Sequence, residues 1–309
     1  MTKPAMKRLK IGLAMVLSAA VLLTACTDGL ASAANLMPVD SEYAVATIDG
    51  AEVTLCRSES EAVDVLRDCM RERDPSVNLF LLTDTTEHDE CKEMMHRLVF
   101  DALEHTGQPA EGDYLDYQLD KWYVSWETNS FKGSPGLLIS YDINFYSSAD
   151  QEKQVDDKVR EIIDSLDLDG LGTEEKIRRI YDYVCSNVVY DDEHFGDEEY
   201  TLMRTAYAAL IEGKANCQGY SVALYRLLLE AGIDNRVICG KAAQPGEPED
   251  KHVWNIVCLD GLYYGLDATW DTSGMSREYY LRTGSYFDRE HKRSEEFLTD
   301  DFMQKYPSA

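Results

Sequence analysis

The sequence lacks the short motifs that would assign a cofactor or a nucleotide directly. None of its eight cysteines lies at the CxxC spacing of a metal site, and no glycine-rich loop of the phosphate-binding or dinucleotide-binding kind is present. No internal repeat is found either. The sequence therefore predicts no metal and no cofactor, and its function has to be inferred from single residues and their spacing.

Basic side chains are scarce. The 309 residues include 30 lysines and arginines against 57 aspartates and glutamates, a formal net charge of −27. Nucleic-acid binding needs basic patches, so this composition argues against DNA or RNA as a partner. It also argues against a protein that lies flat on an anionic membrane. Solubility is the simplest explanation of the acidic surface, and a preference for cationic substrates is the weaker alternative.

Residues 1–25 are typical of a targeting signal rather than of a folded domain. Four basic side chains precede the apolar run Ile11–Leu23, whose 13 residues are too few for a comfortable membrane span. The tetrapeptide LTAC that ends at Cys26 resembles a bacterial lipobox, which implies cleavage before Cys26 and acylation of its thiol. The alternative is an ordinary secretory signal. In both cases the mature protein, with a net charge of −31, is expected to be extracytoplasmic.

The rest of the chain is long enough for two domains after a short tether. Residues 26–40 are mostly small or polar, as expected of a tether between a lipid and a folded domain. We expect an N-terminal α+β domain of unknown role at residues 41–150 and a second domain at residues 151–309. The first has these predicted elements: strands Tyr43–Ile48, Glu52–Cys56 and Val77–Leu82, a helix capped by Ser58, helix Glu87–His105, and segments Tyr114–Glu127 and Leu137–Tyr146.

The second domain contains a cysteine at a predicted helix start. Apolar residues recur at helical spacing from Cys217 to Ala231, and Gly232 ends the run. Cys217 would then lie in the first turn, where backbone N–H groups and the helix dipole favour a thiolate. A lone cysteine is more often a small buried side chain, so this position alone does not identify a nucleophile.

A predicted hairpin carries a histidine and an aspartate. Segments His252–Leu259 and Leu262–Thr269 flank the dipeptide Asp260-Gly261, which is typical of a two-residue type I′ turn. This turn fixes the pairing register, and side chains alternate along each strand. His252 and Asp267 are then diagonal neighbours on one face, within reach of a hydrogen bond. The alternative is a core histidine beside an exposed aspartate.

Three segments together resemble the transglutaminase-like superfamily, whose core is a papain-like cysteine fold. They are GKANCQGYS around Cys217, HVWN at His252 and LDATWD at Asp267, and the resemblance extends from about Glu174 to Trp270. It implies that Cys217 is the nucleophile, that His252 is the base and acid, and that Asp267 orients His252. One departure is that Ala215-Asn216 stand where family members often carry Gly-Val.

The resemblance also implies a fold and a chemistry. We expect an α+β fold in which the helix carrying Cys217 packs on an antiparallel sheet, with one more helix or hairpin after Glu278. The chemistry would be acyl transfer from an amide through a thioester, without a cofactor. Candidate oxyanion donors are the backbone N–H of Cys217 and the side chain of Tyr190, although packing at a helix end explains Tyr190 equally well.

The resemblance leaves the substrate and the acceptor open. We expect a peptide or protein of the cell envelope as substrate, with hydrolysis slightly favoured over cross-linking to an amine. Contact with the membrane is expected through the lipid anchor only. The alternative from another functional class is a surface-anchored binding protein that uses the same cleft without turnover.

Six further cysteines and one acidic stretch have no predicted chemical role. An exported protein could pair its cysteines, but we expect buried free thiols at these positions: Cys56, Cys69, Cys91, Cys185, Cys239 and Cys258. The stretch Asp191–Tyr200 contains six acidic residues, but they do not have EF-hand spacing. A solvated loop is therefore a better interpretation than a calcium site.

The lipobox gives the first testable prediction. Cys26→Ser removes the thiol that would be acylated, so the protein should be released from membranes or remain unprocessed. Membrane fractionation followed by mass measurement of the mature N-terminus checks this. Membrane association and processing identical to those of the unaltered protein would contradict the lipoprotein assignment.

Overall fold

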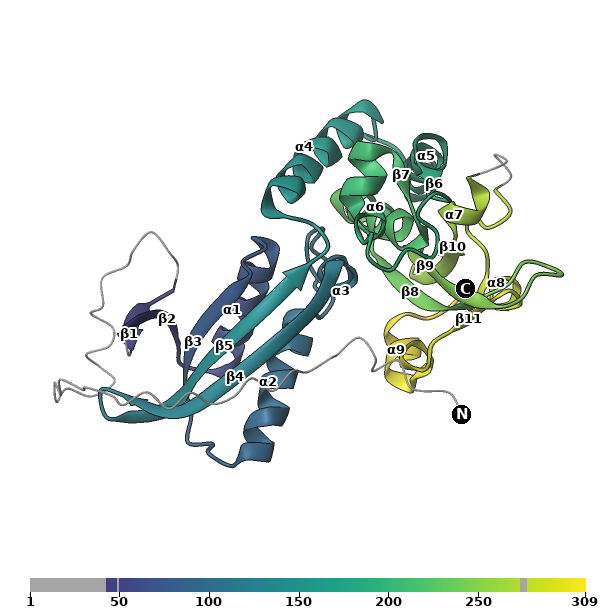
Figure 1. Ribbon diagram of the computed structural model, residues 1–309. Helices are drawn as coiled ribbons and strands as arrows, with labels where there is room; N and C mark the ends of the chain where they lie inside the picture. Colours follow the sequence, from purple (N-terminus) through teal and green to yellow (C-terminus); the bar gives the residue numbers. More distant parts are fainter. Residues whose placement is uncertain (1–42, 49, 273–276) are drawn as a thin grey trace. The chain divides into compact units, whose positions relative to one another are not determined.

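The computed structural model describes residues 43–48, 50–272 and 277–309, which divide into two compact units (Figure 1). The N-terminal unit comprises the described residues up to Glu104 together with Leu119–Phe145, and the C-terminal unit comprises His105–Gln118 and Tyr146–Ala309. The predicted signal, the tether and Cys26 lie outside the described residues. In the part of the chain that is described, no helix has the length and apolar composition needed to cross a membrane.

This division differs from the expected boundary at residue 150 in one segment. His105–Gln118, expected in the N-terminal domain, packs with the C-terminal unit. A buried ion pair explains the difference, because the Asp113 carboxylate accepts two hydrogen bonds from the Arg236 guanidinium, at 2.8 and 2.9 Å. The same carboxylate accepts the backbone N–H of Val237 at 2.7 Å. Such a bidentate contact between distant residues leaves no periodic signal in the sequence.

The N-terminal unit is a five-stranded sheet in the order β1-β2-β3-β5-β4, with two helices. Its elements are β1 (Val45–Ile48), β2 (Ala51–Cys56), α1 (Glu59–Arg71), β3 (Ser76–Leu82), α2 (His88–Ala102), β4 (Leu119–Phe131) and β5 (Ser134–Phe145). The predicted strands and helices are confirmed, and Ser58 caps α1 by accepting the N–H of Glu61. The segment expected at Tyr114–Glu127 is instead split between a helix of the C-terminal unit and strand β4.

The C-terminal unit is built on a four-stranded sheet in the order β10-β9-β8-β11. Its elements are α3 (Asp113–Gln118), α4 (Ala149–Ser165), α5 (Thr173–Asn187), β6 (Val189–Tyr190), the 3-10 turn η3 (Leu202–Arg204), the π-helix η4 (Ala208–Glu212), β7 (Lys214–Ala215), α6 (Cys217–Glu230), β8 (Asn235–Ala242), β9 (Asp250–Leu259), β10 (Leu262–Leu266), α7 (Ala268–Asp271), α8 (Gly284–Phe287), β11 (His291–Arg293), η5 (Glu295–Leu298) and α9 (Asp300–Lys305). Strand β11 pairs antiparallel with β8 (Figure 1), so the end of the chain adds a strand to the sheet as well as short helices.

Helix α6 is the centre of this unit. It begins at Cys217 as predicted, and every residue from Gly219 to Leu229 is buried. The helix packs on β8 and β9, with α3, α4 and α5 around it, which is the expected α+β arrangement of a helix on an antiparallel sheet. The buried Asn255 of β9 donates its side-chain N–H to the carbonyl of Ser221 at 3.0 Å and so joins the sheet to the first turns of the helix.

The predicted hairpin has the predicted register, but its second strand is shorter. Leu262 pairs with Leu259, and the ladder continues to Leu266 opposite Asn255. Strand β10 ends there because Asp267 is the N-cap of α7. Thr269, expected in the second strand of the hairpin, therefore lies in a helical turn instead.

Gly219 allows a close approach at the start of α6. A Cβ atom at this position would lie 2.6 Å from the carbonyl oxygen of Met203 and 2.7 Å from Cβ of Ala215. Neither neighbour is the end of a flexible side chain, so a larger residue would force the backbone of the first helical turn to move. The position of Cys217 therefore depends on the absence of a side chain two residues later.

Gly219→Ala should consequently lower the stability by about 1–3 kcal/mol, the range for overpacking a close contact. Thermal unfolding measures this as a fall in Tm of the C-terminal unit. Gly172→Ala is the matched control, because a Cβ atom at Gly172 meets no other atom within 4 Å. Equal melting temperatures for the two variants would contradict the close approach.

Candidate active site

Cys217 is the first residue of α6, and the side chain of Asn216 caps the helix. The Asn216 side-chain oxygen accepts the backbone N–H groups of Gln218 at 3.0 Å and Gly219 at 3.1 Å. The N–H of Cys217 is not one of these two, so this cap does not use the amide that an oxyanion would need. The side chain of Cys217 is half-buried.

His252 and Asp267 are in direct contact, as the hairpin register predicts. The distance from His252 Nε2 to Asp267 Oδ2 is 2.7 Å. Cys217 lies close enough to His252 for its sulfur to contribute to the raised pKa of the imidazole. Because Nε2 is bonded to the carboxylate, Nδ1 is the ring nitrogen left for the thiol. The three side chains thus form one line of neighbours, with the carboxylate bonded to Nε2 and Nδ1 left for the thiol.

The electrostatics of this line favour a charged imidazole. Burial alone disfavours the imidazolium, but the charge and hydrogen bond of Asp267 outweigh it and, with the contribution of Cys217, raise the pKa of His252 to about 10. Burial likewise disfavours the Asp267 carboxylate, yet the bonds and charges of His252 and His291 hold the pKa of Asp267 well below its usual range. An ionised carboxylate only accepts hydrogen bonds, so the Nε2 of His252 carries a proton.

The turn that presents Asp267 is held from helix α5. The Tyr181 hydroxyl lies 2.8 Å from the backbone carbonyl of Asp267 and 2.6 Å from Oδ2 of Asp271. The Trp270 ring stacks on the His252 ring, with centroids 4.9 Å apart and an interplanar angle of 21°. These contacts fix the direction of the carboxylate and cover one face of the imidazole.

Tyr190 lies close to Cys217. It ends strand β6 and pairs in parallel with Ala215 of β7, two residues before Cys217. Burial first, and then the negative charges of Cys217 and Asp192, raise the pKa of Tyr190 well above its usual range. Its hydroxyl therefore keeps its proton and can donate a hydrogen bond, which an oxyanion donor must do.

His291 also contacts Asp267, although no pattern in the sequence predicts it as a site residue. Its Nε2 lies 3.0 Å from Asp267 Oδ2, and its side chain is fully buried. His291 begins the three-residue strand β11 and is followed by Lys292 and Arg293, so its neighbours in the sequence indicate an exposed segment. Three residues are too few for an alternating pattern to predict a strand.

Among the described residues, two groups of side chains have ligand atoms close enough together to hold a metal ion. In the first group, His252, Asp267 and His291, both Nε2 atoms already point to the same carboxylate oxygen. The second group is Asp191, Glu193 and His194 in the acidic stretch. The Lys214 ammonium lies 3.0 Å from Asp191 and 2.8 Å from Glu193, so a side-chain cation already occupies that position.

The described cysteines of the N-terminal unit, together with Cys185, Cys217, Cys239 and Cys258, are free thiols. Cys56 and Cys91 are buried as predicted, whereas the other four candidates for buried thiols are only half-buried. Burial is the first cause that raises the pKa of Cys185 to about 12. This thiol therefore provides a slow internal comparison for Cys217.

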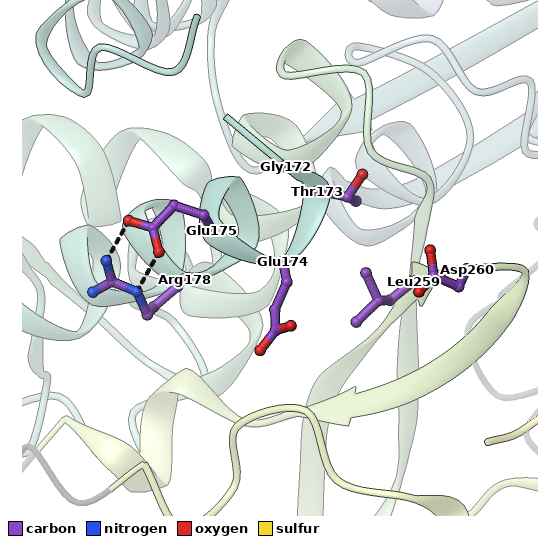
Figure 2. A pocket seen from close by; sticks show the side chains of 7 residues that line it. All are labelled: Gly172, Thr173, Glu174, Glu175, Arg178, Leu259 and Asp260. Atoms are coloured by element: carbon purple, nitrogen blue, oxygen red, sulfur yellow. Dashed lines mark hydrogen bonds and ion pairs between the residues drawn. The ribbon is translucent and has the colours of Figure 1, made fainter. Parts of the chain in front are cut away.

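A pocket of about 540 Å³ lies away from these residues (Figure 2). Its walls are the start of α5, from Gly172 to Arg178, and the β9–β10 turn at Leu259 and Asp260. Leu259 is seven positions along β9 from His252, roughly 23 Å at the rise of a strand. Figure 2 shows that Arg178 is paired with Glu175 inside the pocket. The pocket is therefore separate from the candidate active site.

Comparison with known families supports the resemblance found in the sequence. Residues 160–268 match the model of the transglutaminase-like superfamily. The chain thus contains a transglutaminase-like domain at these positions, which include Cys217, His252 and Asp267. His291 lies beyond the matched residues.

Two curated proteins and one solved structure illustrate the extent of the similarity. Kyphoscoliosis peptidase of Mus musculus is 24% identical over 155 residues, which is 47% of this chain and 22% of that protein. The Homo sapiens protein of the same name is 24% identical over 154 residues, with the same coverage. The chain thus matches about a fifth of the length of these relatives. A crystal structure of a TGase has 14% sequence identity and a TM-score of 0.35, covering 73% of this chain and 64% of the other.

The raised pKa of His252 gives a pH-dependent prediction. Because the folded-state pKa of about 10 exceeds the ordinary value of 6.5, the His252–Asp267 pair contributes stability that is complete below pH 6.5. This contribution should be lost as the pH rises from 6.5 through about 10. Asp267→Asn should lower the pKa of His252 and remove this part of the pH dependence. Histidine-selective NMR titration and urea unfolding at several pH values measure both effects.

Asp260→Asn is the matched control, because it removes a carboxylate from the same hairpin and keeps a dipeptide that suits a type I′ turn. It should leave the His252 titration unchanged. A wild-type His252 that titrates near 6.5 would contradict the ion pair.

Proposed function

We propose, with the transglutaminase-like domain as the premise, that this protein is a cysteine enzyme that cleaves or transfers amide acyl groups. The observation that supports this most directly is the hydrogen bond between His252 and Asp267, with Cys217 at the helix start close to the same imidazole. A half-buried thiol at a helix N-terminus, beside an imidazole with a raised pKa, is suited to form a nucleophilic thiolate. The substrate is proposed to be a peptide or protein of the cell envelope.

In the first half of the reaction, the sulfur of Cys217 attacks the amide carbonyl carbon, and His252 holds the proton that the thiol has lost. The carbonyl oxygen becomes an oxyanion. The N–H of Cys217 and the hydroxyl of Tyr190 are the proposed donors to it. His252 then transfers its proton to the amide nitrogen, the carbon–nitrogen bond breaks, and a free amine leaves a thioester on Cys217.

In the second half, an acceptor resolves the thioester. His252 removes a proton from water or from an amine, the acceptor attacks the thioester carbonyl, and Cys217 leaves as the thiolate. Asp267 keeps the imidazole in one orientation through both halves and stabilises its charged form. We favour water as the acceptor, because water needs no binding site of its own and the two curated relatives are named peptidases.

The proposed location follows from the sequence. Residues 1–25 form the proposed signal, and acylated Cys26 is the proposed membrane anchor. The folded units would then act outside the cytoplasm on envelope peptides. Two acidic groups near Tyr190, Asp192 and Asp250, would favour cationic over anionic substrates.

Thiol labelling tests the proposed nucleophile. At mildly acidic pH, iodoacetamide should alkylate Cys217 well before Cys185, whose pKa is raised to about 12 by burial. His252→Ala should slow the labelling of Cys217, because the imidazolium that stabilises the thiolate is gone. Peptide mapping by mass spectrometry gives the rate at each cysteine. If Cys217 labels no faster than Cys185 and His252→Ala changes nothing, a binding protein without turnover becomes the better account.

Product analysis tests the acceptor. Envelope peptides should be hydrolysed by the wild-type protein, and Cys217→Ala should reduce turnover by roughly 10³-fold or more. A fluorescent primary amine added in excess should appear in a minor fraction of the product. Incorporation of the amine into most of the product would reverse the proposed preference and identify a cross-linking enzyme.

A further inference from the structure

We propose that His291 is a positioning residue of the active site, whose Nε2–H holds the carboxylate of Asp267 in line with His252. The inference rests on the proposed function and extends it to a strand outside the matched residues 160–268. His291 touches neither the thiol nor a substrate carbonyl in the proposed reaction. Its contribution would therefore pass through the carboxylate of Asp267.

The first observation is the complete set of donors around the carboxylate. Asp267 Oδ1 accepts the backbone N–H groups of Thr269 at 3.0 Å and Trp270 at 3.2 Å. Its Oδ2 lies 2.7 Å from Nε2 of His252 and 3.0 Å from Nε2 of His291. An ionised carboxylate offers about four acceptor positions, so these donors use all of them.

The second observation is that the four donors differ in the carboxylate oxygen they bind and in their part in the proposed proton transfer. The two backbone donors belong to α7 and fix Oδ1, but they leave Oδ2 to be placed by side chains. His252 gains and loses a proton in the proposed reaction, so a second donor is needed to keep Oδ2 in one position. His291 comes from β11, which is separated from β9 by strand β8. Oδ2 is thus held from two strands, and one of the two donors takes no part in the chemistry.

The third observation is that the His291 ring is immobilised. It stacks on Phe287 with centroids 3.9 Å apart and an angle of 26°, and it contacts Trp270 at 4.5 Å. Its side chain has no exposed surface. Its Nδ1 is buried and has no hydrogen-bond partner among the described residues. A ring held in this way presents one N–H in one direction, which suits a positioning residue and does not suit a proton relay.

Other ionisable groups near the pair lie on α5, α6, α7 and the segments that follow α7 and α8, and they include Tyr279 and Cys185 as well as the following groups. Asp271 of α7 and Tyr181 of α5 lie behind the Asp267 turn, and Asp288 follows α8 beside His291. Cys217 faces His252 from α6. Of these groups, His291 donates to Oδ2 together with His252. A substitution of His291 should therefore change the titration of His252.

His291→Phe keeps an aromatic ring for the stack and removes the donor. We expect kcat to fall roughly 10- to 100-fold with KM nearly unchanged, the size expected for the loss of one hydrogen bond to a charged group. With Oδ2 held by one side-chain donor fewer, the titration of His252 should shift from its wild-type position in a histidine-selective NMR experiment. His291→Gln places an amide N–H near the position of Nε2 and should restore most of both values.

His291→Asn, which is one methylene shorter and cannot reach Oδ2, should behave like His291→Phe. If thermal unfolding shows that the Phe variant does not fold, the comparison of His291→Gln with His291→Asn still tests the role of His291. An unchanged kcat and His252 titration in His291→Phe, or equal losses in the Gln and Asn variants, would overturn the positioning role. The titration needs no substrate. A wild-type protein without amide turnover would therefore contradict the proposed function, whereas an unshifted His252 would contradict the role of His291.

Discussion

The buried charge of Asp267 is the constraint on which the C-terminal unit depends. Removing a carboxylate from water costs several kcal/mol unless hydrogen bonds and an opposite charge compensate it. Asp267 is 1% exposed, and its compensation comes from the backbone of α7 and from histidines on β9 and β11. Tyr181 of α5 holds the carbonyl of the same residue. Elements that are far apart in the sequence therefore have to assemble before this charge can be buried.

The thiol side of the site depends on the same assembly. Helix α6 is buried over most of its length, so its first turn, with Cys217, has little freedom to shift. Asn255 of β9, the strand that carries His252, donates to the carbonyl of Ser221 one turn further along the helix. The helix that carries the proposed nucleophile and the strand that carries the proposed base therefore pack directly against each other. The raised pKa of His252 is a property of this packing and not of the histidine alone.

The sequence predicts the local parts of this arrangement and misses the long-range ones. The start of α6 and the hairpin register follow from short signals, namely helical spacing after Asn216 and the Asp260-Gly261 turn. The early end of β10 at Leu266 does not follow, because Asp267 caps a helix only after its side chain is fixed. His291 is missed because strand β11 has three residues and forms only by pairing with β8. His105–Gln118 is placed by the ion pair between Asp113 and Arg236, which no local pattern encodes.

The most direct test of the account is to trap the acyl intermediate on Cys217. The protein is mixed with an activated acyl donor and quenched in acid, and its intact mass and peptide map are measured. The account predicts one acyl group on Cys217 that neutral hydroxylamine removes, as expected of a thioester. Asp267→Asn should accumulate this adduct more slowly, because the imidazole is no longer held by the carboxylate. Amide turnover without any adduct on Cys217, or turnover that persists in Cys217→Ala, would contradict the account.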